Sequence, residues 1–120
     1  MIDHIILEVS DIAASKRFYE EALAPLGYRT AMEIEGMASY GVEGMPDFWI
    51  RSGKPSGPVH LAFAGPDRRA VEEFHAAAVS AGGQGNCEPE TRPQFHDNYY
   101  VASVLDPDGN NIEAVCHQAE

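Results

Sequence analysis

The chain repeats a pattern of four residues at a constant offset of 56 positions, and each copy begins on a histidine. The two copies are His4, Asp11, Phe18 and Gly27, then His60, Asp67, Phe74 and Gly83. Each copy is typical of a strand, a helix capped by the aspartate, and a glycine that ends the helix. A duplicated module places equivalent residues at equivalent depths about a pseudo-two-fold axis. We therefore expect the two histidines to converge, and two converging imidazoles indicate a metal.

The first module, residues 1–52, is predicted to fold as β-α-β-β-β. Residues 2–9 have the aliphatic and β-branched content of a buried strand. A helix follows from a cap at Ser10 or Asp11, with apolar residues at helical spacing as far as Leu26. The three remaining strands of this module are predicted at residues 28–33, 37–42 and 47–51.

Residues 52–58 form a linker rich in Ser, Gly and Pro, and the second module spans residues 59–120. Its first strand begins at Val59, and its helix is capped by Asp67. An irregular loop is predicted over residues 84–98. Strands at 99–105 and 111–117 flank the turn sequence Asp-Pro-Asp-Gly-Asn. Hairpin turns make the later strands antiparallel, so the expected fold class is α+β: a mixed sheet with one helix per module.

The ends of the two modules align with an offset of 64, which pairs Trp49 with Glu113. A slip of two residues pairs Asp47 with Glu113 instead, and strand periodicity alone does not choose between them. Two neutral imidazoles and one carboxylate bind a divalent transition metal and leave positions open for water or substrate. The sequence therefore predicts a metal held by His4, His60 and Glu113.

The other candidate site residues come from the first strand and from the long loop. Glu8 shares a strand face with His4 and is a candidate for proton transfer, as are His96 and Tyr99. Arg92 is a candidate partner for an anionic group of a substrate, and the alternative is a solvated loop charge. The predicted substrate-binding residues are Trp49, Asp47, Arg92, Phe95 and Tyr100. His117 shares a face with Glu113, but we expect an exposed residue near the terminus.

Charge and cysteine content narrow the classes of partner. The formal net charge is −11, which argues against binding to nucleic acid and to anionic membranes. No apolar run approaches the roughly 20 residues of a membrane span, and the first residues lack the basic start of a signal peptide. Cys87 and Cys116 are the only cysteines, which suits a reducing compartment. We therefore expect a cytoplasmic protein that binds a small molecule.

Four stretches of the chain resemble the vicinal oxygen chelate superfamily, which includes glyoxalase I, extradiol dioxygenases and bleomycin-resistance proteins. They are Ile-Asp-His-Ile at the start, Ser-Lys-Arg-Phe-Tyr in the first helix, Pro-Val-His-Leu-Ala-Phe, and Asp-Pro-Asp-Gly-Asn-Asn-Ile-Glu near the end. The resemblance covers essentially the whole chain. It implies two β-α-β-β-β modules that form a cup-shaped, eight-stranded sheet around a metal, and short members are commonly homodimers, sometimes with modules exchanged between chains.

Three of the superfamily's four metal-ligand positions match His4, His60 and Glu113. At the fourth, where glyoxalase I-like enzymes carry a carboxylate or glutamine, this chain has Trp49 or Asp47. The resemblance therefore implies a glyoxalase- or dioxygenase-like enzyme that uses iron, manganese, zinc, nickel or cobalt on a small oxygen-bearing substrate. The alternative is a metal-free protein that sequesters a drug or metabolite, as the bleomycin-resistance proteins do.

Overall fold

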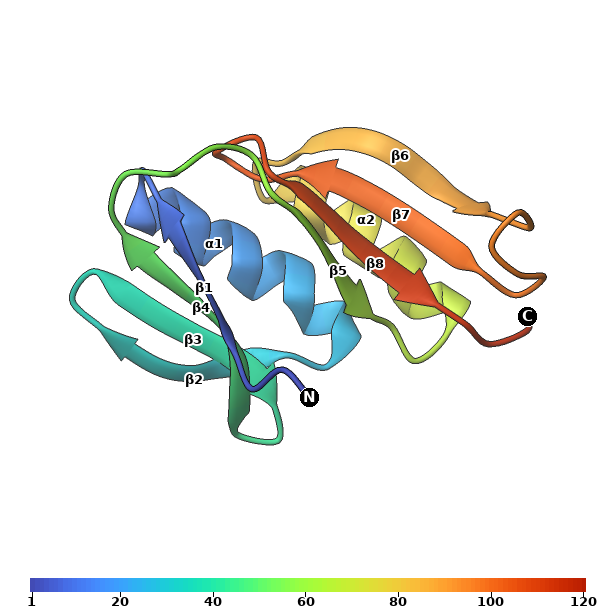
Figure 1. Ribbon diagram of the computed structural model, residues 1–120, viewed down its shortest axis with the longest axis horizontal. Helices are drawn as coiled ribbons and strands as arrows, with labels where there is room; N and C mark the ends of the chain where they lie inside the picture. Colours follow the sequence, from blue (N-terminus) through green and yellow to red (C-terminus); the bar gives the residue numbers. More distant parts are fainter.

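The structure, a computed structural model, describes all residues 1–120 and contains two successive β-α-β-β-β modules (Figure 1). The first comprises β1 (Ile5–Val9), α1 (Ile12–Leu23), the short 3-10 helix η1 (Ala24–Leu26), β2 (Arg29–Ile34), β3 (Met37–Val42) and β4 (Met45–Ser52). The second comprises β5 (His60–Ala64), α2 (Arg68–Ser80), β6 (Gln84–Thr91), β7 (Tyr100–Leu105) and β8 (Asn111–Cys116). The predicted α+β architecture, with one helix per module, is confirmed.

The two modules have the same sheet topology. Each forms a four-stranded sheet, in the order β1-β4-β3-β2 in the first and β5-β8-β7-β6 in the second. The first and last strands of each module pair in parallel, and the other pairs are antiparallel. The eight expected strands are therefore present, divided between two separately hydrogen-bonded sheets.

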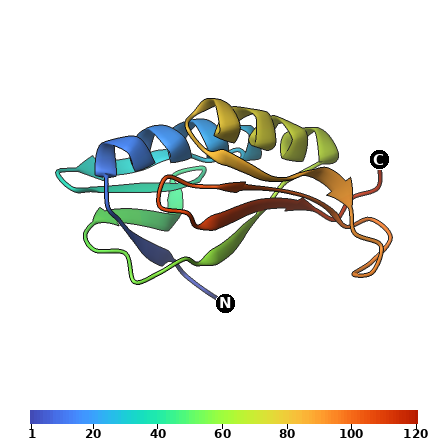
Figure 2. The same ribbon diagram turned by 90° about the horizontal axis from the view of Figure 1, so that it is seen from above.

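Both helices lie on the same side of the two sheets and pack against each other (Figure 2). Alternate strand residues point to opposite faces, so in β4 the side chains of Phe48 and Ile50 are buried beneath a helix whereas Trp49 lies on the other face. The largest fully buried aromatic side chains are Tyr19, Tyr40, Phe18, Phe48 and Phe74. The opposite face of each sheet has no helix over it, and this is the face that carries Trp49 in the first module and Glu113 in the second.

The residues of the sequence repeat build equivalent turns, but the two glycines are needed for different reasons. Asp11 and Asp67 each cap a helix by accepting a hydrogen bond from a backbone N–H, that of Ala14 or Ala70. Gly27 has a φ of 91°, which favours glycine. At Gly83 the constraint is space, because a Cβ would lie 2.5 Å from both Phe18 and Val104.

A buried carboxylate joins the two modules. Asp106, at the start of the turn between β7 and β8, accepts a hydrogen bond from the Tyr19 hydroxyl of α1. The same carboxylate accepts from the backbone N–H of Asn110 at 2.8 Å and from its side-chain amide at 2.9 Å. Asp106 and Asn110 are only 5% and 2% exposed. The Asp-Pro-Asp-Gly-Asn turn therefore fixes the second sheet against the helix of the first module.

The predicted irregular loop at residues 84–98 is wrong in its first half, because Gln84–Thr91 forms the edge strand β6, whereas residues 92–98 are irregular as predicted. This strand pairs only with β7, and its register shifts twice along the pairing. Its residues are mostly exposed, so they show no buried alternation. Pro89 lies within the strand, and proline is tolerated at edges and bulges. Pairing with β7, rather than a pattern of its own, makes this segment a strand.

Candidate functional site

The clearest candidate site lies on the uncovered face of the second sheet, where His60 and Glu113 meet. His60 Nε2 lies 3.2 Å from Glu113 Oε1. The histidine starts β5, and the glutamate lies on the neighbouring parallel strand β8, in register with Ala62. The imidazole is 64% exposed and the carboxylate 14% exposed. A polar pair that is open to solvent on one side can accept a ligand without rearranging the core.

The spacing of this pair suits two neighbouring ligands of one metal ion. Nitrogen and oxygen ligands of Zn²⁺ lie about 2.0–2.2 Å from the metal, so two adjacent ligand atoms are roughly 3.0–3.5 Å apart. The other ring nitrogen, His60 Nδ1, lies 3.4 Å from the side-chain amide of Asn111. The Asn111 amide nitrogen faces Nδ1, and its oxygen accepts from the Asn86 amide at 3.3 Å. With Nδ1 accepting from Asn111, the ring proton lies on Nε2 and faces Glu113, so a metal bound at Nε2 would take the place of that proton.

The equivalent face of the first sheet carries a different set of side chains. β1 pairs with β4 so that Ile6 faces Trp49, just as Ala62 faces Glu113 in the second module. Trp49, not Asp47, is therefore the structural equivalent of Glu113. The Trp49 indole lies edge-on to the His4 ring, with centroids 6.4 Å apart, and His4 Nδ1 contacts the Asp3 carboxylate at 2.7 Å.

Asp47 lies near the start of β4 and is hydrogen-bonded within the chain. It accepts a hydrogen bond of 3.0 Å from the Tyr28 hydroxyl. Burial, together with this hydrogen bond, raises the pKa of Tyr28 well above its ordinary value. Asp47 also lines a mostly apolar cavity of about 310 Å³ between the two modules, together with Leu61 and Phe63 of β5. Its place in the structure is thus at the seam between the modules.

The structure divides the three predicted metal ligands between the two sheets. His60 and Glu113 lie together on the second sheet, whereas His4 precedes β1 of the first. Nowhere in the chain do three His, Cys, Asp or Glu side chains gather closely enough to hold a metal ion. Within one chain, His60 and Glu113 are therefore the only two of the three predicted ligands that lie together.

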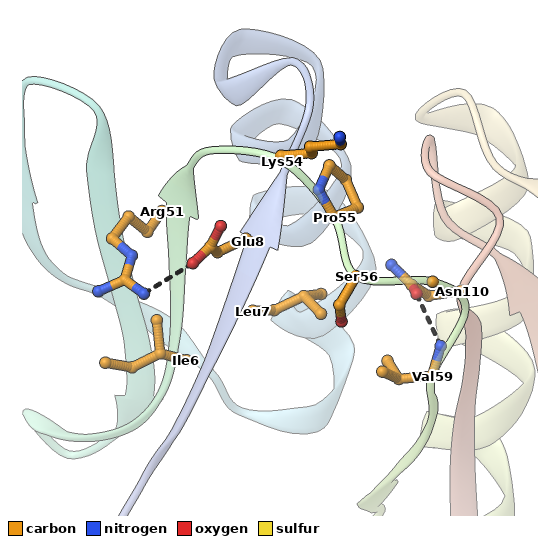
Figure 3. A pocket seen from close by; sticks show the side chains of 10 residues that line it. Ile6, Leu7, Glu8, Arg51, Lys54, Pro55, Ser56, Val59 and Asn110 are labelled. Atoms are coloured by element: carbon orange, nitrogen blue, oxygen red, sulfur yellow. Dashed lines mark hydrogen bonds and ion pairs between the residues drawn. The ribbon is translucent and has the colours of Figure 1, made fainter.

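Glu8, a predicted proton-transfer residue, lies at the far end of β1 from His4. Its carboxylate accepts a hydrogen bond of 2.9 Å from the Arg51 guanidinium of β4, which Figure 3 shows across the two strands. Four residues of a strand span roughly 13 Å, so Glu8 is distant from the His4 end. The pair borders a separate cavity beside the linker.

A second cluster of ring side chains lies beside the end of β8. His96 Nε2 is 2.7 Å from His117 Nδ1, and Tyr99 packs edge-on against both rings. Tyr99 and His117 line a cavity of about 280 Å³ together with Ala62 and Ala64. His117 is exposed, as expected, and it also borders this cavity. The available signal was its strand periodicity, since it lies four residues after Glu113 on the same face.

Three of the predicted substrate-binding residues, Tyr100, Arg92 and Phe95, line none of the cavities. The structure contradicts the predicted place of Tyr100, because this residue faces α2. It donates a hydrogen bond of 2.8 Å to Glu72, and the Arg68 guanidinium stacks over its ring. Arg92 bonds to Glu90 at 2.6 Å and to the Cys87 sulfur at 3.1 Å.

Phe95 is 62% exposed and packs on Tyr99 with ring centroids 5.0 Å apart. The register of β7 explains the error at Tyr100, because this residue pairs with buried Cys116, whereas Ser103 pairs with Glu113. The loop that precedes β7 concealed which of the neighbouring tyrosines points to which face.

Comparison with known proteins agrees with the duplicated fold. Residues 1–114 match the family model of the Glyoxalase/Bleomycin resistance protein/Dioxygenase superfamily. The chain therefore belongs to this superfamily, as the resemblance in its sequence predicted. A search of curated proteins found no match.

Several solved structures have the same fold. A glyoxalase/bleomycin resistance protein from Albidiferax ferrireducens T118 is 28% identical, with a TM-score of 0.83 over 97% of this chain and 98% of that one. A glyoxalase-related enzyme from Fulvimarina pelagi is 23% identical, with a TM-score of 0.74 over 97% and 87%. A lactoylglutathione lyase from Agrobacterium tumefaciens is 16% identical, with a TM-score of 0.72 over 97% and 92%. None of the helices of this chain has the length and apolar content to cross a membrane.

Proposed function

We propose that this chain is a metal-dependent enzyme of the superfamily that acts on a small oxygen-bearing substrate. The observation that carries the proposal is the distance of 3.2 Å between His60 Nε2 and Glu113 Oε1 on an uncovered sheet face. We assign these two side chains as ligands of a divalent transition metal and His4 as the third. Iron, manganese, zinc, nickel and cobalt all accept such a donor set.

When bound, the metal polarises substrate oxygens and stabilises negative charge that develops on them. The chain's own residues would hold and orient the substrate. Ala62 and Ala64 leave space beside the metal ligands, and Tyr99 and His117 form the wall of the same cavity. We assign proton movement to Tyr99 and to His96, which contacts His117 at 2.7 Å. Glu8 is the weaker candidate, because its carboxylate is paired with Arg51.

We also propose that the complete site forms between two copies of the chain. Because α1 and α2 pack together on one side, the faces that bear His4 and Glu113 are both left without a covering layer (Figure 2). The first of these faces also exposes Ile6 and Met45. In a two-fold homodimer, the first sheet of one copy faces the second sheet of the other, and His4 of one chain meets His60 and Glu113 of its partner.

Mixing two inactive variants tests both proposals together. His4→Ala and His60→Ala homodimers each lack a ligand at every site. In a mixed dimer with shared sites, one of the two sites keeps all its ligands, so random mixing restores about one quarter of the wild-type sites. Metal bound per chain is measured after subunit exchange, alongside sedimentation to determine the oligomeric state. If the wild type binds metal but the mixed variants do not regain it, the shared site is overturned. If the wild type itself binds no metal, the metal site is overturned.

The second candidate function is a metal-free binding protein that sequesters a small molecule. The observation that favours it is Trp49, an aromatic side chain at the position equivalent to Glu113. This candidate predicts that ligand affinity is unchanged by a chelator and falls when Trp49 is replaced by Ala. The cytoplasmic location stays a prediction from the sequence.

A further inference from the structure

A cavity of about 270 Å³ lies where the linker between the modules passes the end of β1. Figure 3 shows Ile6, Leu7 and Glu8 on one side of it and linker residues 54–56 on the other. The remaining lining residues are Arg51, Gly57, Val59 and Asn110. None of the proposed metal ligands lines this cavity, so its ligand is independent of the metal.

Hydrogen bonds hold the linker in place at both ends of the cavity. At one end, the Gly53 N–H donates to the Val9 carbonyl at 3.0 Å. At the other, the Val59 N–H donates to Asn110 Oδ1 at 2.9 Å (Figure 3). Gly53 also passes so close to Glu8 that a Cβ would lie 2.5 Å from its carboxylate oxygen. The walls are therefore built by specific contacts, and the linker is more than a loose connection.

The cavity contains the one cationic side chain of the protein that has no protein partner. Of the eight Lys and Arg residues, six pair with a carboxylate, and Arg29 donates to two backbone carbonyls. Lys54 alone makes no such contact, in a chain with 19 acidic residues. The backbone N–H groups of Lys54, Ser56 and Gly57 likewise have no acceptor in the protein. Unused donors and an unpaired ammonium beside a cavity favour an anionic ligand.

We propose that this cavity binds the carboxylate of a small organic acid. The Lys54 ammonium and the free linker N–H groups receive the carboxylate, and Arg51, already balanced by Glu8, adds a second cationic group to the wall. Leu7 and Val59 provide apolar surface for the body of the acid. A neutral molecule of the same shape lacks the charge that Lys54 recognises, so the site discriminates by charge.

Benzoate and its neutral isostere benzamide are suitable probes, used with the full chain and followed by NMR chemical shifts of the linker amides. We expect benzoate to shift the signals of Lys54, Ser56 and Gly57 in a saturable manner, and benzamide to bind at least about tenfold more weakly. Equal affinities for the two probes, or no shift of these amides, would overturn the proposal.

The chain's two lysines provide a matched pair of variants. Lys54→Met is expected to weaken benzoate binding at least about tenfold. Lys16→Met makes the same charge change on α1, where Lys16 pairs with Glu33 at 3.7 Å, and is expected to change the affinity less than about twofold. Equal losses in both variants would show a nonspecific charge effect and overturn the site. Repeating the titration with His60→Ala separates the two proposals, because loss of the metal leaves the benzoate site intact.

Discussion

The two modules share one topology but carry different side chains at equivalent positions. On the uncovered face, the second module pairs a histidine with Glu113 at 3.2 Å, whereas the first places His4 beside the Trp49 ring. Beneath the helices, Tyr19 donates a hydrogen bond to Asp106, whereas the Nε2 of its counterpart, His75, is buried without a partner. The comparison teaches that strand alternation and helix caps are enough to preserve a fold while both site and core polar groups diverge.

The largest expected effect comes from Asp106, which joins the modules. Asp106→Ala leaves the Tyr19 hydroxyl and the amides of Asn110 without their acceptor, so we expect a loss of about 3–5 kcal/mol in the free energy of unfolding. Urea denaturation measures this loss. The control is Glu43→Ala in the corresponding turn of the first module, which is exposed and should cost no more than about 0.5 kcal/mol. Similar losses in the two variants would contradict the role of Asp106.

Alkaline pH should lower the free energy of unfolding because of the tyrosines buried in the first module. Burial raises the pKa of Tyr19 and of Tyr40 well above the ordinary value, and proximity to Asp106 adds to the effect at Tyr19. In the unfolded chain these hydroxyls lose their protons near pH 10. The unfolding free energy should therefore be constant up to about pH 10 and then fall by up to about 1.4 kcal/mol per pH unit for each such tyrosine. Tyr19→Phe should reduce this slope, and an unchanged slope would contradict the assignment.

Trp49→Glu makes the first module resemble the second. It places a carboxylate at the position equivalent to Glu113, so we expect metal affinity to rise about tenfold if Trp49 occupies the fourth ligand position. Isothermal titration with Zn²⁺ measures the change. Trp49→Gln is the uncharged control and should have a smaller effect. Unchanged affinity in the Glu variant would place the fourth position elsewhere.

Tyr19 and His75 provide the smallest and most direct comparison between the modules. Tyr19→Phe removes one donor to Asp106 and should cost about 1 kcal/mol. His75→Leu removes a buried nitrogen that has no partner and should be neutral or stabilise the protein by about 0.5 kcal/mol. Thermal denaturation of the two variants checks the opposite signs. Destabilisation by His75→Leu comparable to that of Tyr19→Phe would show that His75 contributes to packing.

Much of the fold follows from local sequence signals. Asp11 and Asp67 cap their helices as the repeat predicts, and the offset of 64 correctly aligns Trp49 with Glu113. Strand β6 was missed because an exposed edge strand has no buried alternation and is defined by its partner.

The candidate site was harder to predict from the sequence than the fold. Sequence analysis selected His60 and Glu113 from the repeat and from the family resemblance, and the pairing of β5 with β8 places them side by side. It also predicted that His4 and His60 converge, but within one chain the packing of the two modules separates His4 from the pair. It also misplaced Tyr100, since a loop of uncertain length preceded β7. Tertiary arrangement, rather than residue type, therefore decides which of the candidates lie together.

Inductively coupled plasma mass spectrometry of untagged protein, purified without chelator, shows directly whether this chain binds a metal. We expect about one divalent transition metal per chain, lost in His60→Ala and in Glu113→Gln. Protein that is purified without metal and does not bind added metal would contradict the metal-dependent function and favour the metal-free binding protein.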